Sequence, residues 1–326
     1  MAHSPNWRPS ATVDVARRRA DMLARVRDYF LQQKVLAVDT PAISAFASSD
    51  PNIDNIALLR ESTEKWLHTS PESAMKCLLA AGYPDIYSIC RVFRDGEQGP
   101  RHLPEFTLLE WYRLGFQLPE IIADTTTLIA RCMQQEALAE SLEVIDYADA
   151  FRRSAGVDVF AASSDELAAA ANADDAIRQS LGDDRAAWLD LLLVDRVSPT
   201  FAPDRLTVLQ HYPRPQAALA RACPADEQVA DRFEVFYGTL ELANGYVELT
   251  DAVEQRQRFL KDTKDRQAAG KIATPVDELL LAALQHGMPQ CAGVAVGFER
   301  LQMIYEKVDH ISDVVTFANR SGQQNA

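Results

Sequence analysis

Arg94 stands where a strand-like segment, residues 86–93, gives way to a loop rich in glycine and proline. A second strand-like segment begins at Phe106, so the pattern predicts an antiparallel hairpin. A guanidinium at a strand end can bind a phosphate through two parallel hydrogen bonds, and an aromatic ring can stack on a flat base. Arg94 and Phe106 are therefore candidates for nucleotide binding, and a surface hairpin with ordinary ion pairs is the alternative.

Glu110 and Tyr112 follow in the same segment as Phe106. Successive side chains of a strand point to opposite faces, so residues two apart share a face. A carboxylate beside a phenol suits an ammonium group. This pair therefore predicts a site for a positively charged part of a substrate.

Glu241 and Glu248 bracket a third segment, which also contains Asn244 and Gly245. Seven residues apart on a regular strand, the two carboxylates would face opposite sides. A bulge at Gly245 would bring them back to one side. There, together with the asparagine, they could hold Mg²⁺ against the phosphates of ATP. A solvated acidic strand is the alternative.

Arg300 follows a segment of small residues, 293–297, that runs into a predicted helix. Small residues let a ligand approach the backbone closely. A cation in the first turn of a helix opposes the helix dipole, which favours an anion beside it, such as the γ-phosphate of ATP. A core strand edged by glycine is the alternative.

The elements that must position these residues alternate between strand and helix patterns. Apolar residues recur at helical spacing over residues 14–34, and Ser70-Pro71-Glu72 has the composition of a helix start. Strand-like segments are residues 35–38, 66–69, 86–93, 106–112, 206–211, 232–237, 241–250 and 294–297. Strands near both ends of the chain with helices between them predict an α+β fold, with a mostly antiparallel sheet flanked by helices.

The chain is expected to form one catalytic domain over residues 1–326. Residues 1–13 form an extended lead-in, and the Ala- and Asp-rich region at about 150–187 is a helical insertion. The remaining predicted helices are in the region 118–200, at 251–265 and from Phe298 onward.

Composition limits the possible functions. The net charge of −14 argues against a broad nucleic-acid surface, which needs basic residues to neutralise phosphates. The five cysteines include no CxxC pair, which predicts reduced thiols. The sequence shows neither a signal peptide pattern nor an apolar stretch long enough for a membrane span, so we expect a cytoplasmic protein without a membrane partner.

Together these segments resemble the catalytic domain of class II aminoacyl-tRNA synthetases. Arg94 with His102-Leu103-Pro104-Glu105-Phe106 resembles motif 2, and Gly297-Phe298-Glu299-Arg300 resembles motif 3. The helix from Asp14 and the strand that ends at Pro41 resemble motif 1, which builds a dimer interface in that family. The resemblance therefore implies a homodimer that binds ATP and Mg²⁺.

Within the class, residues 69–72, the Glu110-Trp111-Tyr112 segment and residues 241–251 are similar to the lysine type. The segment that resembles motif 1 begins near residue 14, so we expect no anticodon-binding domain before it. A catalytic domain alone resembles the ligases that attach (R)-β-lysine to a lysine of translation elongation factor P. The resemblance implies that lysine or (R)-β-lysine is activated as an adenylate and passed to that factor, with no tRNA as acceptor.

The resemblance also implies roles for individual residues. Arg94 and Arg300 would be catalytic. The ATP site would comprise Arg94, Asp95, Gly96, Glu97, His102, Leu103, Phe106, Glu241, Leu242, Gly297 and Arg300. The amino-acid site would comprise Ser70, Pro71, Glu72, Glu110, Tyr112, Glu248 and Ala295. Glu241 and Glu248 would hold the metal.

The sequence departs from the family pattern at three places. Asp95-Gly96 replaces Asn-Glu, Leu103 replaces an asparagine, and Ala295 replaces a glycine of motif 3. A methyl group at Ala295 would reshape the α-amino pocket and could favour a β-amino group. Two other functions stay open: a ligase that uses a small amine acceptor, and a regulatory paralogue that binds an amino acid or ATP without catalysis.

Overall fold

A nine-stranded sheet forms the centre of the computed structural model, which describes residues 7–60 and 63–318. Within these residues the strand order is β1-β5-β6-β12-β11-β10-β8-β7, and β9 pairs with β10. The strands are β1 (Leu36–Ala37), β5 (Ile86–Phe93), β6 (Glu105–Leu114), β7 (Glu143–Asp146), β8 (Leu206–Pro213), β9 (Ala222–Cys223), β10 (Asp226–Tyr237), β11 (Leu240–Val247) and β12 (Cys291–Gly297). Among the strands that the structure describes, only β1–β5 and β7–β8 pair in parallel, which confirms the expected α+β fold with a mostly antiparallel sheet.

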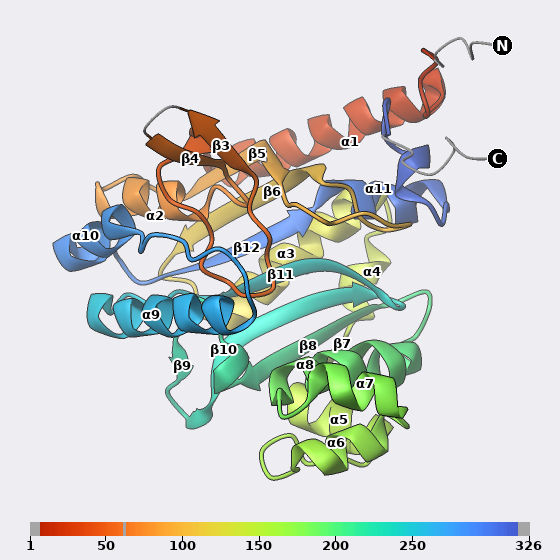
Figure 1. The fold of residues 1–326 in the computed structure, drawn as a ribbon. Coiled ribbons are helices and arrows are strands. Elements are labelled where there is room, and N and C mark those ends of the chain that lie inside the picture. Colours follow the sequence, from red (N-terminus) through yellow and green to blue (C-terminus); the bar gives the residue numbers. More distant parts are fainter. Residues whose placement is uncertain (1–6, 61–62, 319–326) are drawn as a thin grey trace, which may run out of the picture.

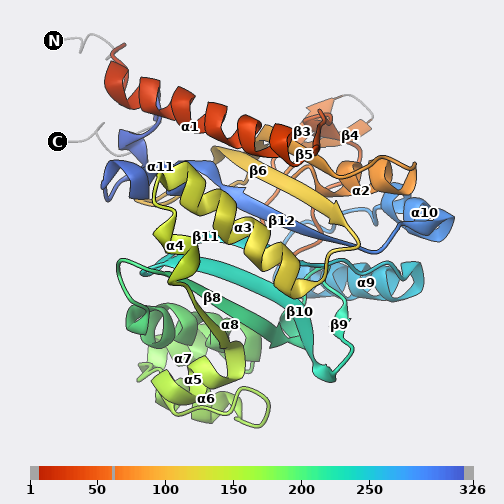
Figure 2. The same cartoon turned by 180° about the vertical axis from the view of Figure 1, so that it is seen from behind.

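One face of the sheet is covered by helices α1 (Val13–Gln32), α3 (Leu118–Met133) and α11 (Phe298–Glu306), as Figure 2 shows. Apolar residues of α1 and α3 pack with those of the central strands in the largest hydrophobic core. Short helix α4 (Ala137–Glu140) follows α3. This face is therefore filled, and a ligand site must lie on the other face.

The other face carries a second layer in front of the sheet (Figure 1). It consists of α2 (Glu72–Ala80), α9 (Ala252–Ala268) and α10 (Glu278–Gly287), with a small sheet of β2 (Ile43–Ser44), β3 (Ala57–Arg60) and β4 (Thr63–Leu67). Apolar residues of α2 and α10 pack in a separate core with Ile86 and Tyr112. The layer thus leaves the middle strands open between its elements.

The helical insertion packs under one end of the sheet (Figure 1). It comprises α5 (Tyr147–Ala155), α6 (Ser164–Ala170), α7 (Asp175–Leu181) and α8 (Arg185–Leu192), close to the range expected. Its core includes Leu209 and Tyr212 of β8 and Phe236 of β10. The insertion therefore shares its core with the main sheet. No helix within the described residues has the length and apolar character to cross a bilayer.

The helix expected from Ser70 begins at Glu72, with the Ser70 hydroxyl 3.4 Å from the Glu72 amide. Of the lead-in, residues 1–6 lie outside the described part. Ser10 and Ala11 bond through their backbone amides to Thr316 and Val315. The rest of the lead-in is therefore tied to the other end of the chain.

Candidate active site

A cavity of about 1820 Å³ opens on the uncovered face, lined by β6, β11, β12 and the loops around them. Typical small-molecule sites have a volume of roughly 300–1,000 Å³. The cavity therefore has room for two substrates side by side. It has a cationic end near β11 and α11 and an acidic end near α2.

Arg94 and Phe106 meet at the cationic end. The guanidinium of Arg94 lies over the Phe106 ring, 5.1 Å from its centroid, and Nη1 is 3.4 Å from Oε1 of Glu97. Nε of Arg94 is buried without a hydrogen-bond partner among the described residues. A buried N–H donor without an acceptor costs about 1–3 kcal/mol, so this arginine fits an anionic ligand such as a phosphate.

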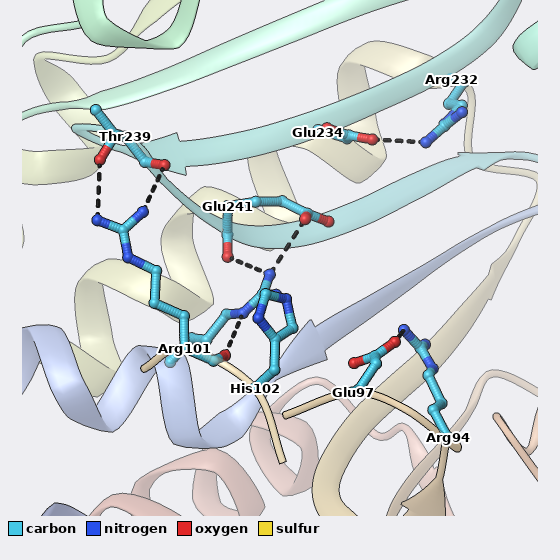
Figure 3. Close-up of polar contacts among 9 residues, drawn as sticks. Arg94, Glu97, Arg101, His102, Arg232, Glu234, Thr239 and Glu241 are labelled. Atoms are coloured by element: carbon cyan, nitrogen blue, oxygen red, sulfur yellow. Dashed lines mark hydrogen bonds and ion pairs between the residues drawn. The ribbon is translucent and has the colours of Figure 1, made fainter. Parts of the chain in front are cut away.

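Arg300 extends from the first turn of α11 into the same end of the cavity. Its Nη1 lies 3.1 Å from Oε2 of Glu241, and its Nη2 lies 2.6 Å from Nε2 of His102. Burial and the charge of Arg300 lower the pKa of His102, which favours a neutral ring that accepts this hydrogen bond. Figure 3 shows His102 and Glu241 in this part of the cavity, together with Arg94 and Glu97.

Glu241 and Glu248 both line the cavity, but the bulge expected between them is not at Gly245. The bulge lies at Leu242, three residues before Gly245. There the register of β10 and β11 shifts, and Leu242 has no partner on β10. Gly245 pairs regularly with Phe233. A Cβ atom there would lie 2.7 Å from the Phe233 ring and 2.8 Å from Cβ of Val294, so packing requires this glycine.

Glu234 on β10 is a carboxylate that the sequence reasoning missed. It lines the cavity and forms an ion pair with Arg232 (Figure 3). Burial, followed by the negative charge of Glu241, raises the pKa of Glu234. Glu248 instead forms an ion pair with a lysine. The structure thus groups Glu241 with Glu234 rather than with Glu248, because β10 and β11 are neighbours at this point.

Three carboxylates gather at the acidic end: Glu72 on α2, Glu110 on β6, and Glu248, which directly follows β11. The Tyr112 hydroxyl donates to Oε1 of Glu110 over 2.7 Å, which confirms that these side chains share a face. The Tyr246 hydroxyl donates to Oε1 of Glu72 over 2.6 Å. Burial, followed by the charge of Glu72, raises the pKa of Glu110, and burial also raises that of Glu248. Burial and neighbouring carboxylates thus disfavour the ionised forms, and a bound cation would offset this effect.

Lys76 lies behind this cluster and was not predicted. Its Nζ is 2.6 Å from Oε1 of Glu72 and 2.6 Å from Oε2 of Glu248, and the side chain is 1% exposed. Helical spacing could have found it, because Glu72 and Lys76 are four residues apart on α2. It is absent from the residues that line the cavity.

β12 forms the floor between the two ends. A Cβ atom on Gly293 would lie 2.5 Å from Oε1 of Glu248 and 2.5 Å from the Tyr112 ring, so the close approach of these side chains requires glycine. Ala295, two residues on, lines the cavity and pairs with Glu110 and Asn244. The motif 3 segment therefore shapes the floor through its small side chains.

The cavity brings together most of the residues named from the sequence. Those that line it are Ser70, Pro71, Glu72, Arg94, Glu97, His102, Leu103, Phe106, Glu110, Tyr112, Glu241, Leu242, Glu248, Ala295, Gly297 and Arg300. Asp95 and Gly96 do not, contrary to expectation. The Asp95 amide bonds to the carbonyl of Asp54, and both residues are exposed, because the loop turns away at the positive φ of Gly96.

A second possible metal-binding group lies outside the cavity. One ligand atom each of His211, Cys223 and Asp231 lie within 4.8 Å of one another. However, Asp231 already accepts from Arg221 over 2.9 Å, and His211 is paired with Asp146. None of the three residues lines the cavity, so this group has no part in the site.

The fold and the cavity are those of a class II synthetase catalytic domain. The family model of tRNA synthetases class II (D, K and N) matches residues 6–321, and the chain belongs to this family. It is also similar to the elongation factor P–(R)-β-lysine ligases of Edwardsiella ictaluri (40% identical over 325 residues, 98% of this chain and 99% of the relative) and Haemophilus influenzae strain Rd (39% over 319 residues, 96% and 97%). The ligase of that name from Hamiltonella defensa is 38% identical over 329 residues, which cover 97% of this chain and 98% of the relative.

Proposed function

We propose that this protein is an ATP-dependent ligase that activates (R)-β-lysine or lysine and transfers it to a lysine side chain of elongation factor P. One observation supports this above all. A single cavity joins two arginines suited to phosphates, Arg94 and Arg300, to an acidic end suited to ammonium groups. The names of the relatives supply the acceptor.

In the first step the substrate carboxylate attacks the α-phosphorus of ATP, and the bond to pyrophosphate breaks. The products are an aminoacyl-adenylate and pyrophosphate. Arg94 binds the α-phosphate and neutralises charge that develops there, while Arg300 and His102 bind the outer phosphates. Phe106 stacks on the adenine. Catalysis of this kind is positioning and charge stabilisation, so it requires no side-chain nucleophile.

Glu241 and Glu234 would hold the divalent metal ion that class II synthetases use with ATP. The two carboxylates face the same cavity, and the negative charge of Glu241 contributes to the raised pKa of Glu234, so a cation between them would relieve repulsion. We propose Mg²⁺, an ion that prefers carboxylate oxygens. Glu248, first assigned to the metal from the sequence, pairs with Lys76 at the acidic end of the cavity, away from the residues proposed for the phosphates. The ion would neutralise phosphate charge.

At the acidic end, Glu110 and Tyr112 bind the side-chain ammonium group of the substrate. Glu72, Glu248 and the Ser70 region receive the other amino group. Oε1 of Glu248 is buried without a hydrogen-bond partner among the described residues, so it can accept from that group. The carboxylate of the substrate then points along β12 toward the phosphate end.

In the second step the neutral ε-amine of the acceptor lysine attacks the activated carbonyl. AMP leaves, an amide bond forms and the amine loses its proton. The charge of −14 fits a protein acceptor better than tRNA. We also propose that residues 1–326 form one catalytic domain, which dimerises through the α1 region.

Exchange of labelled pyrophosphate into ATP tests the first step without any acceptor. The protein should support exchange with (R)-β-lysine or lysine and a divalent metal, and not with arginine, asparagine or aspartate. Exchange with none of these amino acids would refute activation. Exchange with asparagine or aspartate but not with lysine would refute the lysine-type assignment.

A further inference from the structure

Lys76 is an internal cation of the acidic end. Its ammonium group contacts both Glu72 and Glu248 at 2.6 Å, and it lies over the Tyr246 ring, 5.6 Å from the centroid. Burial alone lowers the pKa of Lys76, but the charges of Glu248 and Glu72 outweigh burial and raise it. Lys76 therefore stays protonated at neutral pH.

Glu110 has a different environment from the other two carboxylates. It is 3% exposed and accepts from the Tyr112 hydroxyl, and no cation forms an ion pair with it in the part of the chain that the structure describes. One ammonium group thus serves three carboxylates: Glu110 and Glu248, which are buried, and Glu72, whose side chain is 18% exposed. When all are ionised, the cluster has a formal excess of two negative charges.

We propose that Lys76 is a positioning residue that sets this excess at two and thereby restricts the amino-acid site to substrates with two ammonium groups. This inference rests on the proposed function and deepens it, because it concerns how the same site selects its substrate. Lys76 contacts Glu72 and Glu248 and is not among the residues that line the cavity.

The selection follows from the cost of buried charge. A ligand with two ammonium groups neutralises the cluster. A ligand with one leaves a buried carboxylate either unpaired or protonated, and an unpaired buried charge is strongly unfavourable. A ligand with three brings one positive charge too many. The site therefore selects ligands by their number of positive charges as well as by their shape.

Lys76 also fixes the direction in which Glu248 points. Its Oε2 is held by Lys76, which leaves Oε1 against Gly293, where an added Cβ atom would lie 2.5 Å away. Without the ammonium group, Glu248 would be free to turn or to take up a proton. Either change removes an acceptor from the floor of the cavity.

Calorimetric titration with three matched ligands tests the proposal without any turnover. The ligands are (R)-β-lysine (3,6-diaminohexanoic acid), 3-aminohexanoic acid and 6-aminohexanoic acid. The wild-type protein should bind the diamino acid at least 100-fold more tightly than either monoamino acid. Lys76→Met should weaken binding of the diamino acid at least tenfold, whereas Lys264→Met, at an exposed position on α9, should not.

A double-mutant cycle separates charge from a merely structural role. Glu72→Gln leaves an excess of one charge, so its preference for the diamino acid over 6-aminohexanoic acid should shrink. Lys76→Met/Glu72→Gln restores the excess of two, so it should bind the diamino acid at least tenfold more tightly than the product of the single losses predicts. If Lys76→Met fails to fold, the shrunken preference of Glu72→Gln still tests the account.

The proposal is overturned if the wild-type protein binds either monoamino acid within threefold of the diamino acid. Unchanged affinity in Lys76→Met, or multiplicative losses in the cycle, would also overturn it. Selective binding of the diamino acid with no pyrophosphate exchange would refute the ligase function and leave this inference standing. Pyrophosphate exchange without selectivity for two amino groups would refute this inference and leave the ligase function standing.

Discussion

Nη1 of Arg300 lies 3.1 Å from Oε2 of Glu241 and 3.1 Å from its carbonyl oxygen, which joins the first turn of α11 to the start of β11. A guanidinium near a helix N-terminus opposes the helix dipole, and here a carboxylate compensates for it. The cation is thereby held at the phosphate end of the cavity in the absence of ATP. Its side chain is 21% exposed, so it remains accessible to a ligand.

Arg300→Gln should lower kcat/KM for ATP in pyrophosphate exchange by about 100-fold or more, because a charge that stabilises the transition state is lost. Thermal stability should change little, since partly exposed ion pairs contribute about 0–1 kcal/mol. Arg152→Gln is the control, because exposed Arg152 on α5 forms an ion pair with Asp149 and does not line the cavity. Equal losses in both variants would contradict the assignment.

Gly293→Ala should reduce affinity for the diamino acid at least tenfold. The added methyl group would collide with Oε1 of Glu248 and the Tyr112 ring, both 2.5 Å away, and overpacking of this kind costs about 1–3 kcal/mol. Gly297→Ala is the control, because its Cβ atom would lie 3.7 Å from Arg300. Gly297→Ala should therefore keep its affinity for the diamino acid. The affinities of both variants are measured by titration calorimetry, and similar effects would argue against the tight packing of the floor.

Glu234→Gln should weaken Mg²⁺ binding more than Glu248→Gln does. The concentration of Mg²⁺ that gives half-maximal exchange should rise about tenfold or more in Glu234→Gln, since two carboxylates hold the ion better than one. Glu248→Gln should instead raise KM for the amino acid. The opposite pattern would restore the pair Glu241 and Glu248 as the metal site.

The ligand-free protein should lose stability as the pH rises from about 5 to 8. Burial raises the pKa of Glu110 from 4.5 to about 8, so the folded state binds more protons than the unfolded state in this window. Unfolding then releases protons, and the free energy of unfolding falls with pH. The groups around Glu110 are Glu72, Lys76, Tyr112 and Glu248, with Cys90 on β5.

Urea denaturation at several pH values, compared between the wild-type protein and Glu110→Gln, isolates this contribution. In Glu110→Gln the free energy of unfolding should fall less steeply with pH, because the variant lacks the titrating carboxyl group. Saturating (R)-β-lysine should stabilise the wild-type protein more at pH 8 than at pH 6. Parallel curves for the two proteins would mean that Glu110 is ionised in the empty cavity.

Much of the fold and site could be predicted because the pattern is local. The β5–β6 hairpin, the shared face of Glu110 and Tyr112, and the helix that begins at Phe298 follow from strand alternation and residue type. The bulge was predicted at the wrong residue. Gly245 has no unusual backbone, and its need for glycine comes from the Phe233 ring on the neighbouring strand.

The residues that were missed depend on contacts distant in sequence. Lys76 looks like an ordinary helix lysine until β11 brings Glu248 against it. Glu234 gains its meaning only from the pairing of β10 with β11, which sets it near Glu241. Spacing along the chain indicates only the Glu72–Lys76 pair on α2, whereas the burial of Lys76 and its contact with Glu248 arise from tertiary packing.

The intact mass of purified elongation factor P, after incubation with this protein and MgATP, tests the central claim most directly. With (R)-β-lysine or lysine present, the account predicts a gain of one lysyl unit that requires ATP and is lost with Arg300→Gln. Pyrophosphate exchange without any mass gain would show that the protein activates the amino acid for an acceptor other than elongation factor P, which would contradict the claim.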